Sequence, residues 1–153
     1  MHLSHFDDCV RSPLATAGAP ATVLLVEDER AVRVSLARYL QSVGYHVVQA
    51  FDVDQAIAAT ERHDFAAAVL DVGLPDPAGL GRSGLDVLTR MCSRRPGRPP
   101  TPTPTLIVFT GYALTPEQQA FVRSHGARIM TKPTEYRVLV DHLNARPDSP
   151  YAA

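Results

Sequence analysis

Five short apolar segments recur along the chain, and in the intervals that follow them apolar residues return at helical spacing. The apolar segments lie at 22–27, 45–50, 66–71, 105–110 and 127–131. Their lengths and nearly continuous apolar composition are typical of parallel strands that are buried on both faces. Strands that alternate with single helices form right-handed crossovers, so the pattern predicts a parallel sheet covered by helices on both faces.

Five helices are expected, one after each strand. In the first, apolar residues recur up to Val43, Gly44 supplies a C-terminal stop, and Asp28 is a candidate N-terminal cap. The second, at 53–62, is indicated mostly by alanines. The third begins at the capping pattern Ser83-Gly84-Leu85-Asp86, the fourth runs from Thr115-Pro116 with the capping partner Gln118 to Gly126, and the fifth covers 134–145.

Polar side chains follow four of the five apolar segments, at the point where each predicted strand ends. They are the pair Glu27-Asp28, Asp71, Thr110 and Lys132, which is the only lysine in the chain. In an open α/β sheet the carboxyl ends of the parallel strands form one edge, and ligands bind there. Each residue alone has a simpler explanation, as a helix cap, a turn residue or a surface lysine. Their joint occurrence at four strand ends predicts one polar site.

The chemistry of this predicted site favours phosphoryl transfer. Glu27, Asp28 and Asp71 would place three carboxylates together, which raises their pKa values unless a cation neutralises them. Magnesium fits because it accepts carboxylate, water and phosphate oxygens. Lys132 adds a positive charge and Thr110 a hydroxyl, so the site can hold and neutralise a phosphoryl group. Asp71, on the central strand, is the expected nucleophile and would form an acyl phosphate.

Length, charge and cysteine usage restrict the functional classes. With 153 residues and a formal charge of −1, the chain suits one domain and is not basic enough to bind nucleic acid through its overall charge. Cys9 and Cys92 lack metal-ligand spacing, so they are interpreted as free thiols, with a disulfide as the alternative. The sequence predicts neither a membrane span nor a secretory leader, and the expected location is the cytoplasm.

Four stretches of the chain together resemble the receiver domain of two-component response regulators. They are Val23-Leu24-Leu25-Val26-Glu27-Asp28-Glu29, Val69-Leu70-Asp71-Val72-Gly73-Leu74-Pro75-Asp76, Val108-Phe109-Thr110-Gly111-Tyr112 and Met130-Thr131-Lys132-Pro133. The resemblance implies an α/β fold of the flavodoxin-like, doubly wound type. Its five-stranded parallel sheet would have the order 2-1-3-4-5 and would be covered by five helices.

The resemblance also implies a role for each residue of the polar site. Asp71 would accept a phosphoryl group from a phosphohistidine of a sensor histidine kinase or a histidine phosphotransfer protein. Thr110 and Lys132 would contact the phosphoryl oxygens, and the Lys132–Pro133 peptide bond is expected to be cis. The residues expected to serve Mg2+ are Glu27, Asp28, Asp71 and, through its carbonyl, Gly73.

Four features depart from the family pattern. Ile129 stands where family members usually carry an aromatic residue, so the usual coupled movement of a hydroxyl and a ring cannot operate in its normal form. Gly73 offers no side chain beside Asp71, and Tyr112 is bulky. We expect Tyr112 to shield the acyl phosphate from water and to slow its loss. The loop 74–82 is longer than usual, either as a gate for partners or as a tolerated insertion.

The resemblance also divides the chain. Residues 1–20 are expected to form a flexible tail, 21–146 the receiver domain and 147–153 a short tail without an output domain. The proline-rich segment 94–104 is expected to be a stiff surface connection. Its arginines are a weaker candidate for contact with an acidic partner.

The leading functional hypothesis is a phosphorylation-dependent switch of a two-component phosphorelay, with no enzymatic activity beyond its own phosphorylation and dephosphorylation. It would dock on a protein target through the fourth helix, fifth strand and fifth helix, with Phe121, Tyr136 and Arg137 as candidate contacts, or pass its phosphoryl group onward. The alternative is a receiver-like scaffold that binds a partner without phosphorylation. A phosphatase of the haloacid-dehalogenase type is a third reading, but Gly73 occupies the place of its second aspartate.

Overall fold

The computed structural model describes residues 20–93, 97 and 103–145. The tails expected at 1–20 and 147–153 lie outside the described residues, apart from Pro20. Most of the proline-rich segment 94–104 lies outside them as well. Among the helices that are described, none combines the length and the apolar character required to cross a membrane.

Five parallel strands form one sheet in the order β2-β1-β3-β4-β5, so the fold class expected from the sequence is confirmed. The strands are β1 (Thr22–Val26), β2 (His46–Ala50), β3 (Ala67–Leu70), β4 (Thr105–Thr110) and β5 (Arg128–Thr131). The central strand β3 is buried at every position, which explains why its sequence is a continuous apolar run without alternation.

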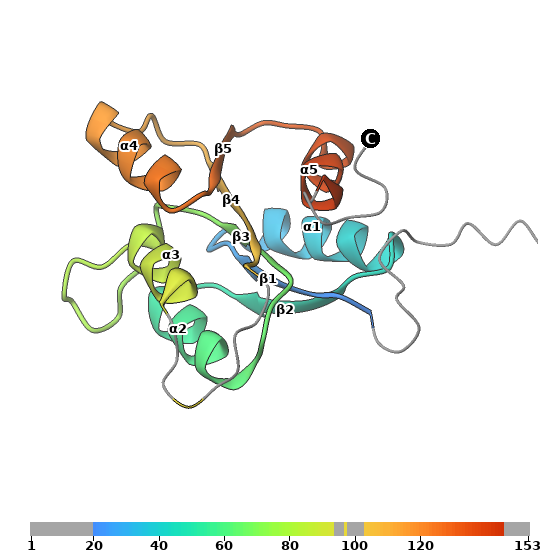
Figure 1. The fold of residues 1–153 in the computed structure, drawn as a ribbon, viewed down its shortest axis with the longest axis horizontal. Coiled ribbons are helices and arrows are strands. Elements are labelled where there is room, and N and C mark those ends of the chain that lie inside the picture. The colour runs from blue at the N-terminus through green and yellow to red at the C-terminus, as the bar shows by residue number, and fades with distance from the viewer. Residues whose placement is uncertain (1–19, 94–96, 98–102, 146–153) are drawn as a thin grey trace, which may run out of the picture.

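Helices cover both faces of the sheet (Figure 1). They are α1 (Arg30–Ser42), α2 (Val53–Arg62), α3 (Gly84–Cys92), α4 (Pro116–Ser124) and α5 (Tyr136–Asn144). The helices α1 and α5 pack on one face, and α2, α3 and α4 pack on the other. This two-sided arrangement follows from right-handed crossovers and leaves the ends of the strands open for a site.

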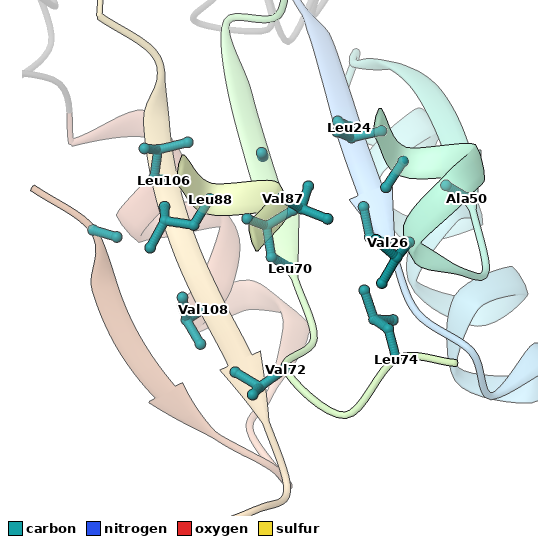
Figure 2. Close-up of a cluster of buried hydrophobic side chains, with 14 of the residues drawn as sticks. Leu24, Val26, Ala50, Leu70, Val72, Leu74, Val87, Leu88, Leu106 and Val108 are labelled. Atoms are coloured by element: carbon teal, nitrogen blue, oxygen red, sulfur yellow. The ribbon is translucent and has the colours of Figure 1, made fainter. Parts of the chain in front are cut away.

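Each face of the sheet has its own apolar cluster. One joins the sheet to α2, α3 and α4, and Figure 2 shows α3 side chains in it beside those of the strands. The other joins the sheet to α1 and α5 through residues such as Leu36, Leu40 and Leu139, which are fully buried. Since burial of a leucine side chain contributes about 1.5–3 kcal/mol, these clusters fix the strands that carry the polar site.

Two of the helix caps predicted from the sequence are confirmed, and a third is not. The capping boxes of α3 and α4 are both formed, by Ser83 with Asp86 and by Thr115 with Gln118. The prediction that Asp28 caps α1 is wrong, because Glu29 occupies the cap position and its side chain makes no capping hydrogen bond. The Asp28 carboxylate is therefore available to the polar site.

Candidate functional site

The polar residues that follow the strands lie together at the carboxyl edge of the sheet. The pattern of interstrand hydrogen bonds continues one residue beyond the strands, and this fixes the backbone of three of them. The amide of Glu27 donates to Ala50 O, that of Asp71 to Val26 O and that of Lys132 to Thr110 O, each at 3.0 Å. The sheet itself therefore sets the positions from which these side chains start.

The Lys132 ammonium links two carboxylates that are far apart in the chain. Its Nζ donates to Asp71 Oδ2 at 2.9 Å and also to Glu27 Oε2. Both carboxylate side chains are almost fully buried, whereas the lysine side chain is 20% exposed. The Lys132–Pro133 bond is cis, as expected. One cation thus compensates two buried negative charges at the end of β3.

Burial and the contact between carboxylates and Lys132 act in opposite directions on the pKa values of these groups. Burial raises the pKa of the Glu27 carboxyl, and the Lys132 hydrogen bond opposes that increase while the charge of Asp71 adds to it. For Lys132, burial lowers the pKa, but the hydrogen bonds to Glu27 and Asp71 outweigh it, and the net direction is upward. Lys132 Nζ also lies 5.5 Å from the centre of the Phe109 ring, where the face of the ring attracts a cation.

Three carboxylates converge at a spacing that a metal ion can bridge. Ligand atoms of Glu27, Asp28 and Asp71 all lie within 4.8 Å of one another. All are oxygens, and buried Glu27 and Asp71 share a single lysine, so the donor set fits a hard divalent cation such as Mg2+. The Gly73 amide donates to Asp71 Oδ1 at 3.2 Å, whereas its carbonyl as a metal ligand stays a prediction.

Thr110 is the last residue of β4, and Tyr112 follows two residues later. Because β4 and β1 flank β3 on opposite sides, these two residues and the pair Glu27-Asp28 lie on opposite sides of Asp71. The Thr110 hydroxyl is buried and accepts a hydrogen bond from the Tyr112 amide at 3.2 Å. A Cβ atom on Gly73 would lie only 2.1 Å from Cε2 of the Tyr112 ring. The ring therefore occupies the space that a side chain at position 73 would fill, although Tyr112 remains 64% exposed.

The long loop 74–82 is organised around the carboxylate of Asp76. Asp76 accepts hydrogen bonds from the amides of Ala78, Leu80 and Arg82, and from the Arg82 guanidinium. Arg82 also pairs with Asp54 of α2, which fastens the loop to the neighbouring helix. The loop has a defined conformation beside the polar site, and whether it gates partners stays a prediction.

The Asp76 contacts give a testable pH dependence. The Arg82 guanidinium and the loop amides lower the pKa of Asp76 from 3.8 to about 2. Because the folded-state pKa is depressed, the carboxylate stabilises the loop above pH 3.8, and this contribution is lost as the pH falls toward 2. We expect the loop amide resonances in NMR spectra of the folded wild type to shift with a midpoint near pH 2. In Asp76→Asn the transition should be absent, and its persistence would contradict the assignment.

Two residues important to the geometry were not identified from the sequence. A Cβ atom on Gly84 would lie 1.9 Å from the Asp71 carbonyl oxygen, so the start of α3 lies directly against the backbone that follows β3. Arg33 of α1 donates to carbonyls of the loop that carries the acidic pair. The sequence analysis identified Gly84 only as part of a capping pattern and did not single out Arg33, because a contact with another segment leaves no local signal.

The expected docking face is only partly exposed. Phe121 packs against the apolar cluster on the α2, α3 and α4 face, and its ring centre lies 4.3 Å from that of His125. Tyr136 packs against the other cluster and contacts Tyr39. Arg137 is exposed. Of the three candidate contacts, Arg137 is thus the most accessible.

Comparison with known proteins identifies the family. The family model of the response regulator receiver domain matches residues 23–144, which include all the polar residues described above. The chain belongs to the response regulator receiver domain family. Receiver domains act as signalling switches in phosphorylation-based signalling, and they bind Mg2+ at an acidic pocket.

Individual relatives agree with this assignment. The chain is 34% identical to the probable transcriptional regulatory protein TcrX of Mycobacterium tuberculosis over 84% of its own length and 50% of that protein, so it spans about half of that relative. The structure of a CheY-like receiver domain protein from Methanospirillum hungatei superposes with a TM-score of 0.68 and 29% identity, covering 80% of this chain and 90% of the other. A response regulator from Burkholderia pseudomallei, solved with a phosphorylated aspartic acid, a calcium ion and citrate, has a TM-score of 0.66 and 25% identity over 80% of this chain and 66% of that one.

Proposed function

We propose that this receiver domain accepts a phosphoryl group on Asp71 and acts as a phosphorylation-dependent switch of a two-component phosphorelay. An Asp71 carboxylate oxygen attacks the phosphorus of a phosphohistidine on a sensor kinase or phosphotransfer protein. The phosphorus–nitrogen bond breaks as the new phosphorus–oxygen bond forms, and the imidazole leaves with the electron pair and takes a proton from solvent. The observation that carries this proposal is the Lys132 ammonium, 2.9 Å from Asp71 Oδ2.

The neighbouring residues support this step by neutralising charge. Lys132 already contacts Asp71 and can follow the oxygens of the transferred group, which lowers the cost of the charge that gathers there. The Thr110 hydroxyl accepts from the Tyr112 amide, and its own proton remains to be donated to a phosphoryl oxygen. Glu27, Asp28 and Asp71 would hold Mg2+, which would supply positive charge beside the transferred phosphoryl group.

The proposal extends to location and partners. We place the domain in the cytoplasm, where a histidine-containing phosphodonor supplies the phosphoryl group and a protein target reads the state of the face formed by α4, β5 and α5. Phosphorylation shifts the balance between two conformers by its different contacts with each, and Thr110 and Lys132 are the residues placed to make those contacts.

Incubation with Mg2+ and a small phosphodonor such as acetyl phosphate, followed by intact-mass measurement, tests the proposal. The wild type should gain the mass of one phosphoryl group, and Asp71→Asn should gain none. The same incubation without Mg2+ is expected to give much less product. An adduct of equal yield in Asp71→Asn would assign the phosphoryl group to another residue.

One observation favours the second candidate, a scaffold that binds its partner without phosphorylation. Ile129 occupies the position that is usually aromatic in the family, and its side chain packs against the core instead of offering a movable ring. A scaffold of this kind would bind its target with the same affinity in the wild type and in Asp71→Asn. The intact set of Asp71, Thr110 and Lys132 supports the switch over the scaffold.

Tyr112 leads to a prediction about the lifetime of the phosphorylated state. Its ring lies against Gly73, two residues from Asp71, and is placed to restrict the approach of water to an acyl phosphate. We expect Tyr112→Ala to shorten the phosphorylated half-life severalfold, as measured by the decay of the phosphorylated mass after the phosphodonor is removed. Tyr112→Phe, which keeps the ring, should decay like the wild type. Equal half-lives for Tyr112→Ala and the wild type would refute the shielding role.

A further inference from the structure

Arg33 makes contacts that the proposed phosphoryl transfer does not use. Its side chain extends from α1 toward the loop between β1 and α1, and one guanidinium nitrogen donates to the carbonyl oxygens of both residues of the acidic pair. The distances are 2.9 Å to Glu27 O and 3.4 Å to Asp28 O. These are the two peptide units that carry the carboxylates at the candidate metal site. A charged donor makes the shorter of these bonds stronger than a neutral one would.

The other side of the Arg33 guanidinium is covered by an aromatic ring. Its Cζ lies 5.3 Å from the centre of the Phe51 ring, within the range of a cation–π contact. Phe51 is 47% exposed, so its ring contacts the guanidinium from the surface of the domain. Its backbone is fixed, because its amide donates to Gln55 Oε1 and the next residue, Asp52, caps α2. The Phe51 ring thus contacts the guanidinium from the loop between β2 and α2, whose backbone is held in place.

We infer that Arg33, supported by Phe51, is a positioning residue for the divalent cation that the proposed function places between Glu27, Asp28 and Asp71. By fixing two consecutive carbonyl groups, Arg33 limits the rotation of the peptide planes from which the Glu27 and Asp28 side chains project. The Glu29 amide closes the same turn by donating to Glu27 Oε1 at 3.2 Å. Residues that orient metal ligands in this way change metal affinity without touching the metal.

The positioning role predicts a change in Mg2+ affinity opposite in direction to the change that the charge of Arg33 alone would cause. Arg33 is a cation close to an acidic cluster, so its charge alone opposes the binding of a second cation. If Arg33 acted only through its charge, its neutralisation would tighten Mg2+ binding. If it acts by positioning the loop, its neutralisation weakens Mg2+ binding in spite of the more favourable field.

The experiment is a calorimetric titration of the unphosphorylated protein with MgCl2 alone. We expect Arg33→Gln to weaken Mg2+ binding by about tenfold, the lower end of the range for residues that orient metal ligands. Phe51→Leu should weaken it by less, because Arg33 keeps its hydrogen bonds to both carbonyls. Arg30→Gln is the matched control, since it removes the same charge from the first turn of the same helix. It should bind Mg2+ as tightly as the wild type or more tightly.

The outcomes separate this inference from the proposed function. Arg33→Gln that binds Mg2+ as tightly as the wild type, or more tightly like Arg30→Gln, overturns the positioning role and leaves phosphoryl transfer to Asp71 intact. A wild type that binds no Mg2+ overturns both. Thermal melting of each variant shows whether the fold is kept, and Arg33→Lys checks the geometry. A lysine there keeps the charge but loses the planar guanidinium, so it should restore only part of the affinity.

Discussion

Lys132→Met is expected to destabilise the fold by about 3 kcal/mol in Mg2+-free buffer at neutral pH, because it leaves two buried carboxylates without their cation. Glu27 and Asp71 are almost completely buried, and Lys132 Nζ is the cation that contacts both. The value lies at the low end of the range for breaking a buried ion pair. The lysine side chain is 20% exposed, so water can enter the space that the ammonium group leaves beside the carboxylates. The same variant should also accept phosphoryl groups far more slowly.

Urea unfolding with and without Mg2+ measures this effect. A divalent cation between the carboxylates would replace the missing charge, so Mg2+ should restore part of the lost stability of Lys132→Met. Arg90→Met is a suitable control, because its ion pair with Glu61 lies on the surface with both side chains at least half exposed. Such pairs contribute little to stability. Equal losses in Lys132→Met and Arg90→Met would contradict the charge balance described for the site.

Gly84→Ala is expected to destabilise the protein by about 3 kcal/mol or more, through a clash of backbone with side chain that cannot relax locally. The added Cβ would lie 1.9 Å from the Asp71 carbonyl oxygen and 3.0 Å from Val72 Cα. Since both are backbone atoms of the segment that carries the proposed phosphoacceptor, α3 must move away from that segment. Helix propensity alone would predict that Gly84→Ala stabilises the protein, because alanine is favoured over glycine in helices by about 1 kcal/mol.

Gly111→Ala provides the matched control for this substitution. It lies in the loop after β4, at the same edge of the sheet, and the nearest atoms to an added Cβ are Lys132 Cβ and Cδ at 4.0 Å. We expect its thermal unfolding curve to resemble that of the wild type, whereas Gly84→Ala should unfold at a clearly lower temperature and lose phosphoryl acceptance. Similar melting temperatures for the two variants would show that α3 does not depend on this close contact.

The architecture could be predicted because it is encoded in local patterns. The strand β3 is apolar throughout because both of its faces are covered, and the capping boxes of α3 and α4 rest on residues three positions apart. The polar site could be located because Asp71, Thr110 and Lys132 each follow or end a strand of one parallel sheet. Parallel strands bring their carboxyl ends together whatever their separation in the chain.

The remaining features could not be predicted because they depend on contacts between segments. The hydrogen bonds of Arg33 depend on how α1 leaves the sheet, and the connection between Arg82 and Asp54 depends on where α2 lies beside the long loop. The first helix also begins one residue later than the Asp28 cap would have required, a difference that local propensity does not resolve. In each case the missing information is a distance in space rather than a pattern in sequence.

Borohydride reduction of the phosphorylated protein, followed by peptide mass spectrometry, tests the central claim most directly. Hydride attacks the activated carbonyl of an acyl phosphate and converts the aspartate into homoserine, so the modified residue is marked permanently. Phosphoryl transfer to the carboxylate beside Lys132 predicts homoserine at position 71 and at no other position. Homoserine at position 28 instead, or an unmodified Asp71 in protein that has gained the phosphoryl mass, would contradict it.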